Sequence, residues 1–113
     1  MKLTTKSANA ENQRKITDLL KLKGRVYVYL ANKVIGQRFL QEAEREGFTF
    51  CGGAKPTERE YDDIFAINKD MTINYVGFIG HIASRSAKRI GGERLFKVDY
   101  EKYCQNSKDY ICK

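Results

Sequence analysis

The segment "RVYVYLANKVIGQRFLQEAEREGFTF", residues 25–50, contains three successive elements and decides the class of fold. Its first six residues, 25–30, are mostly β-branched or aromatic, which predicts a strand. Asn32 then caps a helix over 33–46, where apolar residues recur at i, i+4 and i+8. Gly47 ends that helix, and an extended segment follows. The domain therefore combines strands with an amphipathic helix.

The flanking sequence adds further elements. A charged helix is predicted over 9–22, before Gly24. Two apolar runs, 63–68 and 72–82, are separated by a short turn and predict a β-hairpin. Glycines inside the second run indicate a bulge or a close approach to the backbone. A last strand is predicted at 94–98.

This order predicts an α+β fold with a mostly antiparallel sheet of four to five strands. One amphipathic helix packs on a face of the sheet, and an extra helix precedes it. We assign residues 1–24 to the charged N-terminal helix and 25–113 to a single α+β domain.

Composition narrows the class of partner. The 113-residue chain has a net charge of +7, with the basic surplus near its two ends, which favours a phosphate-bearing or polyanionic partner. It contains no apolar run of 18 residues and no signal-peptide pattern, so we expect no membrane partner. Three cysteines are too few for a secreted disulfide scaffold, which predicts a cytosolic protein.

The most basic stretch is "HIASRSAKRIGGERLFK", residues 81–97, with five cations and two adjacent glycines. Guanidinium groups and glycine-rich backbone both suit phosphate oxygens. We predict a strand, a mobile cationic loop and a strand, with the loop closing over the phosphates of a nucleotide-like ligand. Neither glycine pair of the chain, at 52–53 or 91–92, fits a P-loop or Rossmann pattern, and each is also compatible with an ordinary turn.

Catalytic and metal-binding patterns are weaker. His81 is the only histidine, and it could pair with Glu93 or Lys88 in a metal-independent nuclease, although a packing or surface role is the simpler interpretation. The cysteines lack the paired spacing of a zinc site. We predict no metal, no cofactor and no enzymatic activity.

The segments 25–60, "INKDMTINYVGFIGHIA" and "RLFKVDYEKY" resemble small proteins of phages and prophages of low-GC Gram-positive bacteria, in particular the first Thoeris anti-defence sponge family. The resemblance covers about residues 25–103. It implies a phage-encoded, homo-oligomeric protein in the cytoplasm of the infected host. Such a protein sequesters a cyclic ADP-ribose isomer, and in some members cyclic oligonucleotides, without degrading it.

A pocket for such a ligand needs arginines for the diphosphate, an aromatic ring to stack on adenine and an amide for ribose hydroxyls. The chain offers four arginines, Tyr75 or Phe78 for stacking, and Asn74 for ribose. The predicted ligand-binding residues are Arg25, Asn74, Tyr75, Phe78, His81, Arg85, Lys88, Arg89 and Arg94. The tyrosines and phenylalanines are equally compatible with ordinary sheet core.

A second class of function remains open. A basic protein of this size could bind nucleic acid, or dock on a nucleoprotein complex as anti-CRISPR proteins do. That interpretation requires many cations on one continuous face, including those of the N-terminal segment. Strong salt dependence of binding would distinguish it from a pocket that uses few cations.

Overall fold

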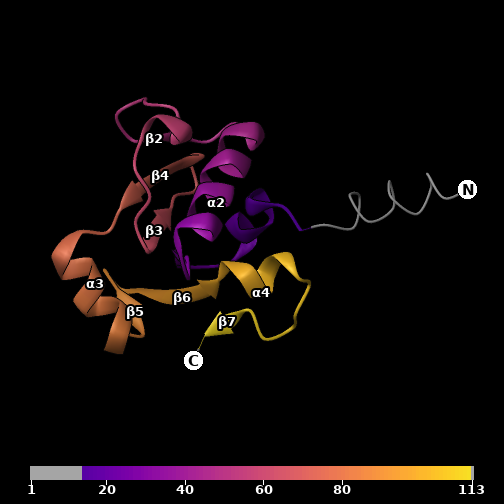
Figure 1. Cartoon of the computed structure of the whole chain (residues 1–113). Helices are drawn as coiled ribbons and strands as arrows, with labels where there is room; N and C mark the ends of the chain where they lie inside the picture. The colour runs from indigo at the N-terminus through magenta and orange to yellow at the C-terminus, as the bar shows by residue number, and fades with distance from the viewer. Residues whose placement is uncertain (1–13, 113) are drawn as a thin grey trace, which may run out of the picture.

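The computed structural model describes residues 14–112, in which one mixed sheet carries helices on both faces (Figure 1). The elements in chain order are η1 (Ile16–Lys21), β1 (Arg25–Tyr29), α2 (Lys33–Glu46), β2 (Thr49–Phe50), η2 (Pro56–Glu58), β3 (Ile64–Ile67), β4 (Thr72–Tyr75), α3 (Gly77–Ser86), β5 (Arg89–Ile90), β6 (Glu93–Asp99), α4 (Tyr100–Cys104) and β7 (Ile111–Cys112). The two η elements are 3-10 helices.

The sheet differs from the predicted one. Its order is β2-β4-β3-β1-β6-β5, and β7 also pairs with β6, which makes seven strands in the described residues. The pairs β1–β6 and β2–β4 are parallel, so the prediction of a mostly antiparallel sheet of four to five strands is wrong. The parallel partners of β1 and β6 are about 70 residues apart along the chain, and local sequence patterns predict hairpins rather than pairings of that range.

The main core lies between the sheet and α2. Asn32 accepts a hydrogen bond from the backbone of Ile35, and Gly47 ends the helix with a positive φ of 99°, so both predicted caps are confirmed. Phe39 of α2 is fully buried against the ring of Phe65 on β3. The helix that the sequence predicted most clearly therefore covers the largest apolar surface.

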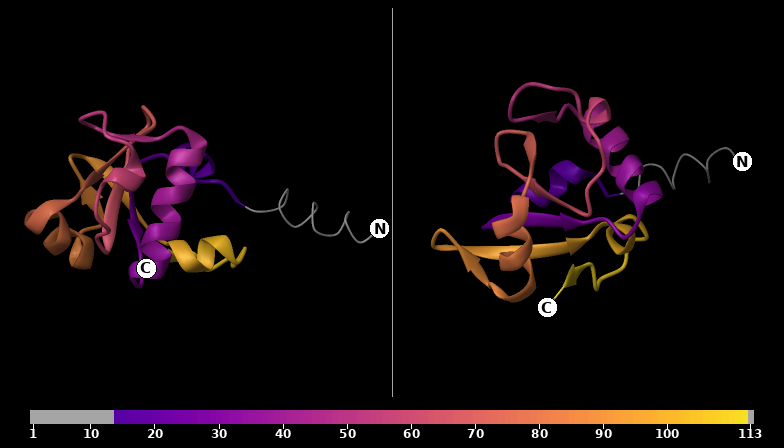
Figure 2. Two further views of the ribbon diagram at one scale, coloured as in Figure 1. Left: turned by 45° about the horizontal axis from the view of Figure 1, so that its top comes forward. Right: turned by 60° about the vertical axis from the view of Figure 1, so that its left-hand side comes forward.

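The opposite face carries α3, as Figure 2 shows. The predicted strand over 72–82 is half correct, because the chain leaves the sheet after Tyr75 and turns at Gly77, where φ is 72°. Residues Gly77–Ser86 form the helix α3 instead of the second half of a bulged strand. An added Cβ at Gly80 would lie 2.5 Å from Cβ of Val76, which caps the start of α3, and 3.5 Å from the hydroxyl of Tyr27 on β1.

The N-terminal helix was predicted over 9–22, and its first five residues lie outside the described part of the chain. Residues 16–21 are helical, but as a 3-10 helix. Ile16 and Leu19 are buried in the core beneath α2. The carboxylate of Glu46 accepts hydrogen bonds from the backbone N–H groups of Ile16 and Thr17, which fastens η1 to the end of α2.

None of the helices in residues 14–112 combines the length and the apolar character that crossing a membrane requires.

Candidate anion-binding site

A basic pocket lies along the outer edge of β6. There β5 pairs with the start of the strand and β7 with its later residues, while the end of α3 closes one side. The pocket has a volume of about 620 Å³, within the range of small-molecule sites. Its lining consists of Arg85, Ser86, Ala87, Lys88, Arg94, Leu95, Lys97, Lys108, Asp109, Ile111 and Cys112.

The charge of this lining is strongly positive. Five of its side chains are cationic (Arg85, Lys88, Arg94, Lys97 and Lys108), and Asp109 is the one acid among the lining residues. The Arg94 guanidinium lies 4.5 Å from the centre of the Phe96 ring, a cation–π contact that orients it. So many cations around one volume favour an anionic ligand.

Residues 81–97, which form much of this pocket, do not have the predicted strand–loop–strand arrangement. The first part belongs to α3, and the rest is the β5–β6 hairpin. Gly91 and Gly92 both have positive φ, at 58° and 83°, and they form the hairpin turn. Arg89 donates a hydrogen bond to the Gly92 carbonyl, so its guanidinium closes the turn. Gly91 and Gly92 thus form an ordinary turn, which the sequence left open as the alternative to a phosphate-binding loop.

Three of the nine predicted ligand-binding residues meet in the pocket: Arg85, Lys88 and Arg94. Two further cations, Lys97 and Lys108, were not among the predicted site residues. Lys97 lies in the basic stretch, but Lys108 reaches the pocket only because β7 pairs with β6. The six predicted residues that do not line it are Arg25, Asn74, Tyr75, Phe78, His81 and Arg89.

The residues predicted for adenine and ribose have other contacts. Asn74 accepts a hydrogen bond from Asn68 at 2.8 Å. Tyr75 stacks on Phe50, with ring centres 5.4 Å apart, and its hydroxyl donates to the Glu60 carbonyl. Phe78 is 78% exposed on the outer side of α3. The predicted combination of arginines, an aromatic ring and an amide is therefore not assembled in the basic pocket.

His81 ties α3 to the start of β3. Its Nδ1 is 2.8 Å from the Gly77 carbonyl oxygen, and its Nε2 is 2.8 Å from Oδ1 of Asp63, with Asp62 at 4.0 Å. The hydrogen bond to Gly77, followed by that to Asp63, raises the pKa of His81. The bond from His81 also lowers the pKa of Asp63. Because both ring nitrogens face acceptors, the imidazolium is favoured, and it offers no lone pair to a proton or a metal ion.

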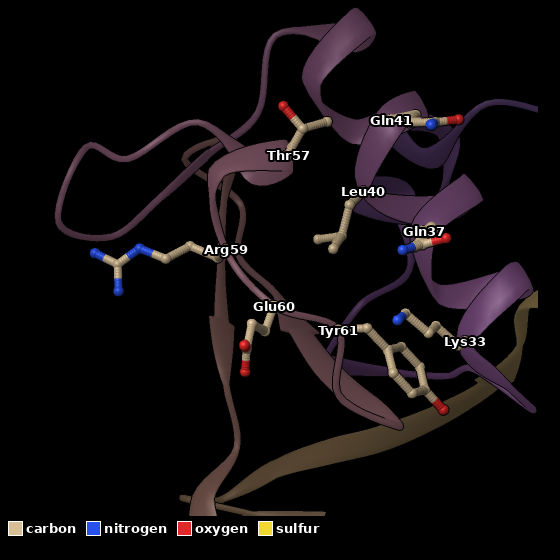
Figure 3. A pocket seen from close by; sticks show the side chains of 8 residues that line it. All are labelled: Lys33, Gln37, Leu40, Gln41, Thr57, Arg59, Glu60 and Tyr61. Carbon is tan, nitrogen blue, oxygen red and sulfur yellow. The ribbon is translucent and has the colours of Figure 1, made fainter.

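A second pocket, of about 630 Å³, lies between α2 and residues 57–61 (Figure 3). Leu40 and Tyr61 point into it, whereas Arg59 extends away from the helix. The Tyr61 ring packs directly over Gly36 and its hydroxyl donates to the Leu30 carbonyl at 3.0 Å. This pocket mixes one acid with two cations, so its charge does not select an anion as the basic pocket does.

Comparison of the chain with protein-family models, with curated proteins and with solved structures finds no match.

Proposed function

We propose that this protein binds a phosphate-bearing nucleotide in the basic pocket and holds it without chemical change. The observation that carries the proposal is the gathering of five cations, from α3, the β5–β6 hairpin, β6 and the segment before β7, around one volume of about 620 Å³. Charge-assisted hydrogen bonds from Arg and Lys are about twice as strong as neutral ones, and phosphate oxygens accept several at once.

The resemblance to Thoeris anti-defence sponges makes cyclic ADP-ribose isomers the first ligands to test. In this proposal the protein is phage-encoded, acts in the cytoplasm of an infected bacterium and removes an immune signal from its receptor. The diphosphate would contact the cations, while Leu95 and Ile111 supply apolar contact. Because no aromatic ring lines the pocket, phosphate contacts would supply most of the affinity.

Two features favour capture over turnover. Burial raises the pKa of Cys112, the one thiol in the lining, so the sulfur stays protonated and is a poor nucleophile near neutral pH. His81 lies outside the lining and is engaged at both ring nitrogens. The pocket itself offers five cations against one carboxylate, and this excess of positive charge suits retention of an anion.

Nucleic-acid binding is the alternative. Arg89 and Arg94 are exposed and directly opposite each other on the β5–β6 hairpin, and Lys88 adjoins them. Lys88 and Arg94 line the pocket and Arg89 lies outside it, so the row extends the positive surface past the pocket for a phosphate backbone to follow. Such binding would weaken steeply with salt, because each neutralised phosphate releases counterions.

The test is calorimetric titration of the protein with cyclic ADP-ribose isomers, ADP-ribose, cyclic dinucleotides, inorganic pyrophosphate and a single-stranded oligonucleotide. The variant Lys97→Ala/Lys108→Ala removes two pocket cations. We expect its affinity for the nucleotide to fall at least about 100-fold, since each charged hydrogen bond contributes roughly 1.5 to 3 kcal/mol. Lys33→Ala/Lys55→Ala is the matched control, with the same loss of charge on residues outside this pocket.

Equal affinity of the two double variants for every ligand would refute the pocket as the site. Recovery of the bound nucleotide unchanged after heat denaturation is expected for capture, and a degraded nucleotide would refute it. Binding of the oligonucleotide alone, weakening by about 10³-fold or more between 50 and 200 mM salt, would establish the alternative.

A further inference from the structure

The outer face of α3 is apolar and uncovered. Phe78 is 78% exposed, Ile79 is 75% exposed and Ile82 is 47% exposed. They are three of the five large hydrophobic residues that are exposed in residues 14–112. The opposite side of the same helix, with Gly80 and Ser84, is buried against the sheet. Three large apolar side chains exposed together on one helical face mark an interaction surface.

The charges beside this face have a definite order. His81 and Arg85 are four residues apart and share one flank of α3, next to the exposed apolar residues. Asp62 and Asp63 gather around His81 near the middle of the helix. Arg85 stands one turn further on, in the last turn of α3. Negative charge therefore precedes positive charge along one flank.

We propose that a second copy of this chain covers the face, with the two α3 helices antiparallel about a twofold axis. Such an axis keeps the charged flank of both copies on the same side while it reverses the helix direction. Arg85 of each copy then approaches Asp62 and Asp63 of the other. A twofold axis along the helices would make the pair parallel and place the two charged flanks on opposite sides of the interface, where Arg85 could not reach the partner's Asp62 and Asp63. Charge complementarity therefore selects the antiparallel arrangement.

The size of the face sets the strength of this dimer. A ten-residue helix is about 15 Å long, so α3 alone buries much less than the roughly 800 Å² per partner of a standard interface. We therefore expect a weak and reversible dimer. This inference goes beyond ligand capture and does not depend on it, because Phe78, Ile79 and Ile82 all lie outside the basic pocket. Of the residues that the dimer would use, only Arg85 also lines that pocket.

The first experiment is sedimentation velocity of the full chain without ligand, from about 5 to 500 µM. We expect a monomer–dimer equilibrium for the unmodified chain. Ile82→Asp should weaken it at least about 30-fold, because the centre of a small interface carries most of its binding energy. Val34→Asp is the matched control, since Val34 is 64% exposed on α2 and should leave the equilibrium unchanged.

The second experiment tests the antiparallel pairing with two surface variants that preserve the core. Arg85→Glu alone and Asp62→Lys alone each place like charges together in a homodimer, so each should weaken self-association about tenfold. An equimolar mixture of the two variants should form a heterodimer with the affinity of the unmodified chain. Asp63 is left intact because it holds His81.

A monomer at every concentration would overturn the proposal, as would a dimer that Ile82→Asp leaves unchanged. Charge variants that weaken the dimer without recovery in the mixture would overturn the antiparallel arrangement. Loss of nucleotide binding in Lys97→Ala/Lys108→Ala, with the dimer intact, leaves this inference standing, so the two proposals fail separately.

Discussion

The two faces of the sheet differ in the interactions that hold a helix against them. Against α2 the strands bury a large apolar cluster, in which Phe39 and Phe65 have no exposed surface. Against α3 the buried cluster is small, with Tyr27 and Leu95 among its four members. Hydrogen bonds add to this small cluster in holding α3 in place. The Tyr29 hydroxyl donates to the Ser84 carbonyl at 2.9 Å, and His81 forms a hydrogen bond with Asp63.

Because of this difference, the part of the molecule that stabilises the fold is not the part that carries the candidate binding site. The α2 face has the burial that makes the fold stable, whereas the end of α3 and its neighbouring strands carry the basic pocket. Elements held by few apolar contacts open locally at a lower free energy than the rest of the domain. The helix α3 is therefore free to serve a ligand or a partner without weakening the core.

Truncations to alanine on the two faces give the largest test of this comparison. Phe39→Ala should lower the free energy of unfolding by about 3 to 5 kcal/mol, because it leaves a cavity in the large core. Leu95→Ala, on the α3 face, should cost about 2 kcal/mol, since its small cluster borders solvent and can relax. Urea unfolding monitored by circular dichroism measures both, and a larger loss for Leu95→Ala would reverse the comparison.

A smaller effect comes from the packing of Tyr61 on α2. An added Cβ at Gly36 would lie 1.8 Å from Cδ1 of that ring. Gly36→Ala should therefore displace the ring, break its bond to the Leu30 carbonyl and lower stability by about 1 to 3 kcal/mol. Gly52→Ala is the control, because no atom lies within 4 Å of its added Cβ. Equal unfolding midpoints for the two variants would show that the α2 face tolerates this crowding.

The smallest effect is the pH dependence of the His81–Asp63 pair on the α3 face. The pKa of His81 is raised, so its contribution is full below the ordinary value of 6.5 and is lost as pH rises through the folded value. The pKa of Asp63 is lowered, so its contribution is full above the ordinary value of 3.8 and is lost as pH falls through the folded value. The pair therefore stabilises most between those two ordinary values.

The size of that contribution is modest. The side chains are 29% and 60% exposed, so solvent screening limits the pair to roughly 0.2 to 1 kcal/mol. His81→Gln should flatten the fall in unfolding free energy between pH 6 and 8, measured by urea unfolding at several pH values. An identical slope in the variant would show that other groups titrate there.

The accuracy of prediction also differs between the two faces. Helix α2 was predicted with its caps, because Asn32, Gly47 and the apolar spacing are all local signals. Helix α3 was missed, because "TINYVGFIGHI" alternates apolar residues well enough to suggest a strand. The deciding feature is the positive φ at Gly77, which turns the chain out of the sheet. A glycine in a strand-like run does not specify which way the chain turns.

The candidate site was only partly predictable for a similar reason. The basic stretch identified Arg85, Lys88 and Arg94, because a local excess of cations is visible in the sequence. Lys108 could not be identified, since its place in the pocket depends on β7 pairing with β6. The exposed apolar face of α3 was not predicted, because a strand over 72–82 would not place Phe78, Ile79 and Ile82 on one face.

The sequence by itself determined the strand–helix start of the domain, the caps of α2 and the cationic character of residues 81–97, because these follow from local conformational preference and charge. Only the tertiary structure decided the parallel pairing of β1 with β6, the helical form of α3 and the convergence of cations around one pocket. Those features depend on contacts between distant residues, whose free energy is gained only when the whole sheet has formed.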